Sequence, residues 1–106
     1  MNNLFVPEEV KDEFVARYVK DVGLGVDPDS VIQKILDESY VYVALRCGKF
    51  DIETNPTGKG LVFERARYAR SNAAELFYEN FFSELAGFAW SLRVEEADEP
   101  TQDDSQ

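Results

Sequence analysis

Apolar side chains return at the spacing of an α-helix along most of this chain, and this period restricts the possible folds more than any other sequence feature. The first repeat has a spacing of four and consists of Val10, Phe14, Tyr18 and Val22. A repeat of this kind places its members on one side of a helix. Pro7 suits the first helical position, and Gly23 favours termination. The sequence therefore predicts a helix from Pro7 to about residue 22.

A second helical pattern follows two residues that are typical of a helix start. Asp27 is a good N-cap and Pro28 fits the first turn. The apolar positions of this pattern are Ile32, Leu36, Tyr40, Val43 and Cys47, and Gly48 ends it. Residues 40–47 also alternate as a strand would and are rich in strand-forming side chains. We favour a helix because no turn residue interrupts the segment after Asp27.

Residues 48–60 contain three glycines and one proline, which predicts a connection. Residues 61–93 then contain a single glycine, Gly87, and are interpreted as one long helix with two distinct faces. One face is aromatic and carries Phe77, Phe81, Leu85, Phe88 and Leu92. The other is a seam of mostly small residues, named here the small-residue seam, which consists of Ala66, Ala69, Ala73, Leu76, Ser83, Gly87 and the adjacent Trp90.

An alternative interpretation divides this segment in two. Asn72 and Glu75 have the spacing of a capping box and are consistent with a new helix start. Residues 61–70 would then form a strand or a short separate helix.

These patterns predict an all-α fold, a small bundle of two short N-terminal helices and one long C-terminal helix. The alternative is an α+β fold with short strands at 40–47 and 61–68. We expect one domain over residues 1–94 and a disordered acidic tail over 95–106, which has no large apolar side chain. The expected core consists of Phe14, Tyr18, Leu36, Phe77, Phe81, Leu85, Phe88 and Leu92.

The composition argues against most catalytic and metal chemistry. The chain has no histidine and one cysteine, so it lacks the commonest general base and the usual zinc ligands. The Thr57-Gly58-Lys59-Gly60 segment lacks the spacing of a phosphate-binding loop and is interpreted as a surface turn. Cys47 is interpreted as a buried structural thiol. We therefore expect no catalytic residues, no metal and no cofactor, and we do not expect an enzyme.

Charge is the feature of this sequence that points most directly to a partner. With 21 acidic and 11 basic residues, the formal net charge is −10. Carboxylates held on rigid helices resemble the phosphates of a nucleic acid and attract basic surfaces. The candidate acidic contact residues are Glu8, Glu9, Asp12, Glu13, Asp27, Asp29, Glu75 and Glu79. The same charge disfavours direct binding to nucleic acid and to anionic membranes.

Two further features suggest other partners. Arg65, Arg67 and Arg70 lie in the basic part of the sequence around Tyr68 and are candidates for internal ion pairing, for an anion or nucleic acid, or for an acidic protein. The small-residue seam with Trp90 is a candidate homodimer interface.

The leading functional hypothesis is a non-catalytic inhibitor or regulator that occupies a basic, nucleic-acid-handling surface of another protein. Accessory proteins of phages and mobile elements, of anti-CRISPR or anti-restriction type, and toxin-neutralising immunity proteins have this character. The alternatives are a nucleic-acid-associated protein that uses the arginines and a structural homo-oligomer subunit. The single cysteine, together with the absence of a basic, apolar leader pattern and of a long apolar run, predicts a cytoplasmic protein.

Overall fold

The computed structural model describes residues 4–19 and 31–97, and these residues form five helices with no strand among them. The helices are α1 (Glu8–Tyr18), α2 (Val31–Cys47), α3 (Pro56–Arg70), α4 (Ala74–Asn80) and α5 (Phe82–Ala97). The all-α prediction is confirmed, including the helical assignment of residues 40–47. The alternative strands at 40–47 and 61–68 are not supported.

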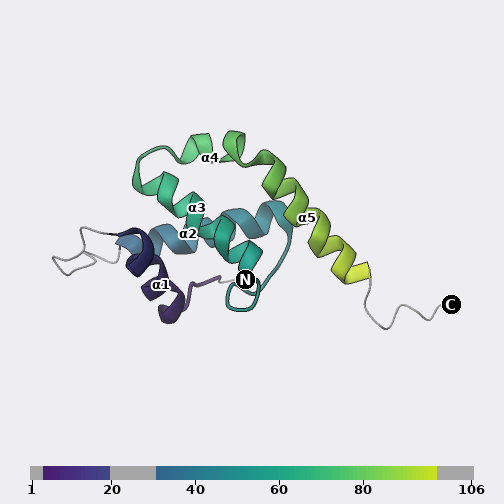
Figure 1. Cartoon of the computed structure of the whole chain (residues 1–106), viewed down its shortest axis with the longest axis horizontal. Coiled ribbons are helices and arrows are strands. Elements are labelled where there is room, and N and C mark those ends of the chain that lie inside the picture. The colour runs from purple at the N-terminus through teal and green to yellow at the C-terminus, as the bar shows by residue number, and fades with distance from the viewer. Residues whose placement is uncertain (1–3, 20–30, 98–106) are drawn as a thin grey trace.

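Helix α2 lies at the centre of the bundle, with α3 crossing one side and α5 crossing its C-terminal end (Figure 1). Helix α1 packs against the other end of α2, and α4 lies beyond the C-terminal end of α3 (Figure 1). The segment before α1 is held on α2, because the Val6 amide donates to Asp37 Oδ1 at 2.8 Å and Gln33 Nε2 donates to the Val6 carbonyl at 2.9 Å.

Aromatic contacts join the helices into one core. Phe63 of α3 contacts Phe14 of α1, with ring centroids 5.3 Å apart. At the other end, Phe50 lies 5.1 Å from Phe88 of α5. Of the predicted core residues, Phe14, Leu36, Phe77, Leu85 and Phe88 are buried, whereas Tyr18, Phe81 and Leu92 are partly buried. Edge-to-face ring pairs of this kind add to the free energy gained from burial.

The prediction of one long helix over 61–93 is wrong. The chain turns at residues 71–73 and again at Phe81, which separates α3, α4 and α5. The alternative break near Asn72 is confirmed in position, but not as a capping box. Asn72 has a φ of 59°, and the N-cap of α4 is Ala73, which makes no side-chain capping bond. Folding back lets Phe77 reach Tyr42 and Tyr68, contacts that a straight helix would forgo.

The predicted connection over 48–60 is too long, because α3 begins at Pro56. Asn55 caps the helix by accepting a 3.0 Å hydrogen bond from the Gly58 amide. Pro56 occupies the first turn, where its missing N–H costs nothing. The Thr57-Gly58-Lys59-Gly60 segment is therefore a turn of helix and not a surface turn.

Other predicted boundaries also shift. Helix α1 ends at Tyr18 instead of residue 22, and Pro7 is its N-cap. Helix α5 continues to Ala97, beyond the predicted domain end at residue 94. The predicted helix start at Asp27 and Pro28, the terminator Gly23 and the tail from residue 98 onward lie outside the described residues.

Asn72 provides a test of the turn between α3 and α4. Its left-handed backbone costs a β-branched residue about 1–2 kcal/mol, whereas glycine adopts this conformation freely. We expect Asn72→Val to lower the free energy of unfolding by that amount and Asn72→Gly to leave it unchanged or raise it slightly, as measured by urea denaturation. Equal stability of the two variants would contradict the backbone assignment.

Candidate protein interaction surfaces

The candidate acidic residues fall into two groups on different helices. Glu8, Glu9 and Asp12 lie on α1 and are exposed, and these three residues are named the α1 acidic group. Glu75 and Glu79 lie on α4, are also exposed, and are named the α4 acidic group. Helix α3 runs between α1 and α4 (Figure 1), so the two groups are separate surfaces.

Glu13 differs from the other acidic candidates because it is already neutralised. It receives a 2.6 Å ion pair from Arg17 and a 2.7 Å ion pair from Lys59 of α3. The Glu13–Arg17 pair follows from their spacing on one helix turn, and the Lys59 contact is made by the fold. Glu13 therefore ties α1 to α3. Asp27 and Asp29, the remaining candidates, lie outside the described residues.

Arg65 and Arg67 make contacts within the protein. Arg65 Nη1 donates to Ser39 at 3.2 Å, and the guanidinium lies 4.6 Å from the centroid of the Tyr42 ring. Arg67 forms a 2.6 Å ion pair with Glu64 and lies 5.1 Å from the centroid of the Tyr18 ring. These contacts favour internal pairing over an external phosphate for both residues. Arg70 is exposed at the end of α3.

The small-residue seam is not continuous, because its members lie on different helices. Ala66 on α3 is buried, and Ala69 and Ala73 are partly buried. Leu76, Ser83, Gly87 and Trp90 are exposed on α4 and α5. Gly87 lines a groove of about 560 Å³ between α3 and α5 that Gly60 also lines. The seam as one helical stripe is therefore incorrect, and its exposed half is divided between two helices.

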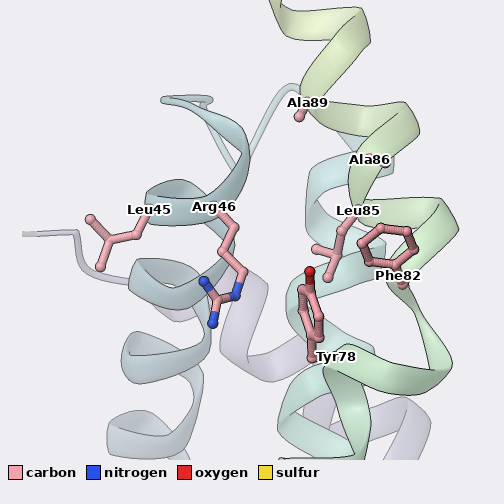
Figure 2. Close-up of a pocket in the computed structure, with 7 residues that line it drawn as sticks. All are labelled: Leu45, Arg46, Tyr78, Phe82, Leu85, Ala86 and Ala89. Carbon is pink, nitrogen blue, oxygen red and sulfur yellow. The ribbon is translucent and has the colours of Figure 1, made fainter.

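A second groove, of about 380 Å³, lies between α2 and α4–α5 and was not predicted as a site. Figure 2 shows Arg46 reaching from α2 toward Tyr78, with Phe82 on the other wall and Leu85, Ala86 and Ala89 along α5. The Arg46 guanidinium lies 5.2 Å from the centroid of the Tyr78 ring. We name this feature the α2–α5 groove.

Aromatic side chains in and next to the α2–α5 groove are exposed to solvent. Phe82 is 54% exposed, and Trp90, two turns further along α5, is 64% exposed. By helical spacing alone, Tyr78 and Phe82 lie beside Phe77 and Phe81, at the edge of the predicted aromatic face. Their exposure depends on where α2 crosses α5, and no local pattern contains that information.

Cys47 lies behind this groove and is buried, as predicted. Its Sγ is 3.4 Å from the Leu85 carbonyl, and burial raises the pKa of its thiol while Arg46 lowers it by a smaller amount. Within the described ranges no three metal-binding side chains come together. No helix in these ranges is long and apolar enough to span a membrane.

The raised pKa of Cys47 predicts a pH dependence. The folded state favours the neutral thiol, so its contribution to stability is complete below the pKa of the unfolded chain, about 8.5. That contribution is lost as the pH rises from there through the higher pKa of the folded state. We expect the free energy of unfolding to fall between about pH 8 and 9.5, a window chosen below the titration of Tyr40, whose pKa burial also raises. Urea denaturation of Cys47→Ala should show a smaller fall; an equal fall in this variant would assign the effect elsewhere.

Comparisons with known protein families, with curated proteins and with solved structures found no match. The functional proposal therefore rests on the geometry and charge of the chain itself.

Proposed function

We propose that this protein is a non-catalytic inhibitor or regulator that places acidic helix surfaces against a basic, nucleic-acid-handling surface of another protein. The proposal rests on how its charges are distributed. The carboxylates of the α1 and α4 acidic groups are exposed and form no ion pair with any residue that the structure describes, whereas Arg17, Lys59 and Arg67 are paired within the protein. These five exposed carboxylates contribute to the formal net charge of −10 and are open to a partner. A field of this sign increases the rate of encounter with a basic partner.

Because the two acidic groups lie on separate surfaces, they restrict how a partner protein can bind. A partner that covers both must extend across α3, where Lys59 pairs with Glu13 of α1 and Arg67 pairs with Glu64. A partner that covers one group needs only a basic patch the size of a helix. Inhibitors of phage or mobile-element origin, of anti-CRISPR or anti-restriction type, are the class in which such acidic helices block a nucleic-acid channel.

Affinity capture tests this proposal. The full chain is used as bait in host-cell lysate at about 50 mM salt, and bound proteins are released at about 500 mM, where screening weakens exposed charge contacts. We expect a dominant basic protein in the released fraction. With that protein purified, Glu8→Gln/Glu9→Gln/Asp12→Asn or Glu75→Gln/Glu79→Gln should weaken binding roughly tenfold or more, since several charge contacts are lost together.

Glu38→Gln/Glu53→Gln is the matched control, because both residues are exposed and lie outside the two groups. It should weaken binding only slightly, through the change in net charge. Recovery of nucleic acid without a basic protein, or equal binding by all the variants, would overturn the proposal.

A further inference from the structure

The α2–α5 groove combines apolar walls with positive charge, although the protein as a whole is strongly acidic. On its α5 side the residues at helical spacing are Phe82, Ala86, Ala89, Trp90 and Arg93. The first three line the groove, and Trp90 and Arg93 continue the same face toward the C-terminus. Exposed aromatic side chains gathered on one face are typical of protein contact sites.

The cations of this face have no carboxylate partner in the described part of the chain. Arg46 contacts the rings of Tyr42 and Tyr78, and Arg93 lies 6.0 Å from the centroid of the Trp90 ring. Neither forms an ion pair, whereas Arg17, Lys59 and Arg67 all do. Two arginines that have no ion pair among the described residues thus lie at or beside one apolar groove, where their charge is available to a partner of opposite sign.

We infer that the α2–α5 groove is a docking site for an acidic amphipathic segment of a partner protein. Arg46 receives a carboxylate of that segment, and its apolar side chains cover Phe82, Ala86 and Ala89. Arginine presents a planar fork that binds carboxylates through paired hydrogen bonds. This inference goes beyond the proposed function, which uses the acidic groups on α1 and α4.

Charge complementarity favours this occupant over the two obvious alternatives. A second copy docked groove to groove about a two-fold axis would gather Arg46 and Arg93 of both copies in one interface, and this concentration of like charge disfavours it. A nucleic acid strand would stack on the aromatic rings, but it carries a phosphate on every nucleotide, and a chain of net charge −10 repels it more strongly than a peptide with a few carboxylates. A peptide with a few carboxylates among apolar residues matches both properties of the groove.

Peptide selection tests the inference. A random library of displayed peptides, each about 12 residues long or roughly three helical turns, is selected against the immobilised full chain. We expect the enriched sequences to combine Asp or Glu with large apolar residues. Trp90 is the only tryptophan, so its emission should shift to shorter wavelength when a synthetic copy of such a peptide binds. Arg46→Glu and Phe82→Ser should each weaken that binding roughly tenfold or more.

Lys34→Glu provides the matched control. It makes the same charge change on an exposed residue of α2, about 18 Å from Arg46 along the helix. We expect it to bind the peptide within about twofold of the unmodified protein, since exposed charges at this separation are largely screened. Circular dichroism of all variants establishes that they are folded.

Several results would overturn the inference. These are enriched peptides without acidic residues, equal peptide affinity of Arg46→Glu and Lys34→Glu, competition of the peptide by a single-stranded oligonucleotide, and a dimer in sedimentation that Phe82→Ser dissociates. Peptide binding that survives Glu75→Gln/Glu79→Gln would separate this site from the proposed acidic surface. The two proposals can therefore fail independently.

Discussion

Substitution of Gly58 by alanine is expected to lower the free energy of unfolding by about 1–3 kcal/mol, the usual cost of overpacking a core. Gly58 is buried in the first turn of α3, where a Cβ atom would lie 2.5 Å from Cδ2 of Phe50 and 2.9 Å from Cζ of Phe88. Two aromatic rings from different parts of the chain meet the glycine at once, and they also contact each other. Relief therefore requires that the Phe50 loop or α5 move away from α3.

Gly60 is the matched control for this prediction, since it lies in the same turn of α3 but is exposed. A Cβ atom there would meet no atom within 4 Å. Gly60→Ala should raise the free energy of unfolding by about 0.5–1 kcal/mol, because alanine loses less backbone entropy in a helix. Urea denaturation of both variants measures the difference. A stabilised Gly58→Ala would show that Phe50 and Phe88 do not pack against this turn.

The first two helices were predictable because their information is local. Val10 and Phe14 on α1, and Leu36 and Val43 on α2, lie at the helical spacing that places them in the core. Gly48 ends α2 with a φ of 122°, a conformation that favours glycine. Each of these features can be interpreted without knowing what lies opposite.

The division of residues 61–93 was harder to predict because the apolar period continues across both breaks. A straight helix keeps more backbone hydrogen bonds, whereas the folded arrangement gains the contacts of Phe77 with Tyr42 and Tyr68. That balance depends on α2, which is distant in sequence. The start of α3, by contrast, had a local signal: Asn55 followed by Pro56 is typical of a cap and first turn. The glycines at positions 58 and 60 obscured this signal, because glycine is unfavourable inside a helix. Gly58 is required because the rings of Phe50 and Phe88 pack against it.

For the surfaces, composition indicated the carboxylates but not their arrangement. The division into α1 and α4 groups follows from the position of α3, and Glu13 is removed from the exposed set by Lys59, 46 residues away. The α2–α5 groove was missed for the same reason. Arg46 and Phe82 belong to different helices, and only the crossing of those helices makes them neighbours.

The largest loss of stability is expected for Phe77→Ala, about 3–5 kcal/mol, as for other large-to-small changes of buried aromatic residues. Phe77 is fully buried and is the one fully buried side chain of α4, a helix of seven residues. Its ring lies 5.9 Å from Tyr42, 5.8 Å from Tyr68 and 4.8 Å from Phe81, measured between centroids. A helix this short is marginal without tertiary packing, and this ring is the buried apolar contact that α4 makes with α2 and α3.

Phe82→Ala is the control for Phe77→Ala, because it removes a phenylalanine side chain that is not buried in the core. Phe82 lies five residues later and is more than half exposed, so its removal should cost less than about 1 kcal/mol. Phe77→Leu, which keeps much of the buried volume, should fall between the two. If α4 is held by Phe77, then Phe77→Ala should also speed amide hydrogen exchange in residues 74–80 more than in α2, because local opening of α4 becomes easier. Uniform acceleration in all helices would instead mean that α4 and α2 unfold together, and that the wall carrying Tyr78 is as rigid as the wall carrying Arg46.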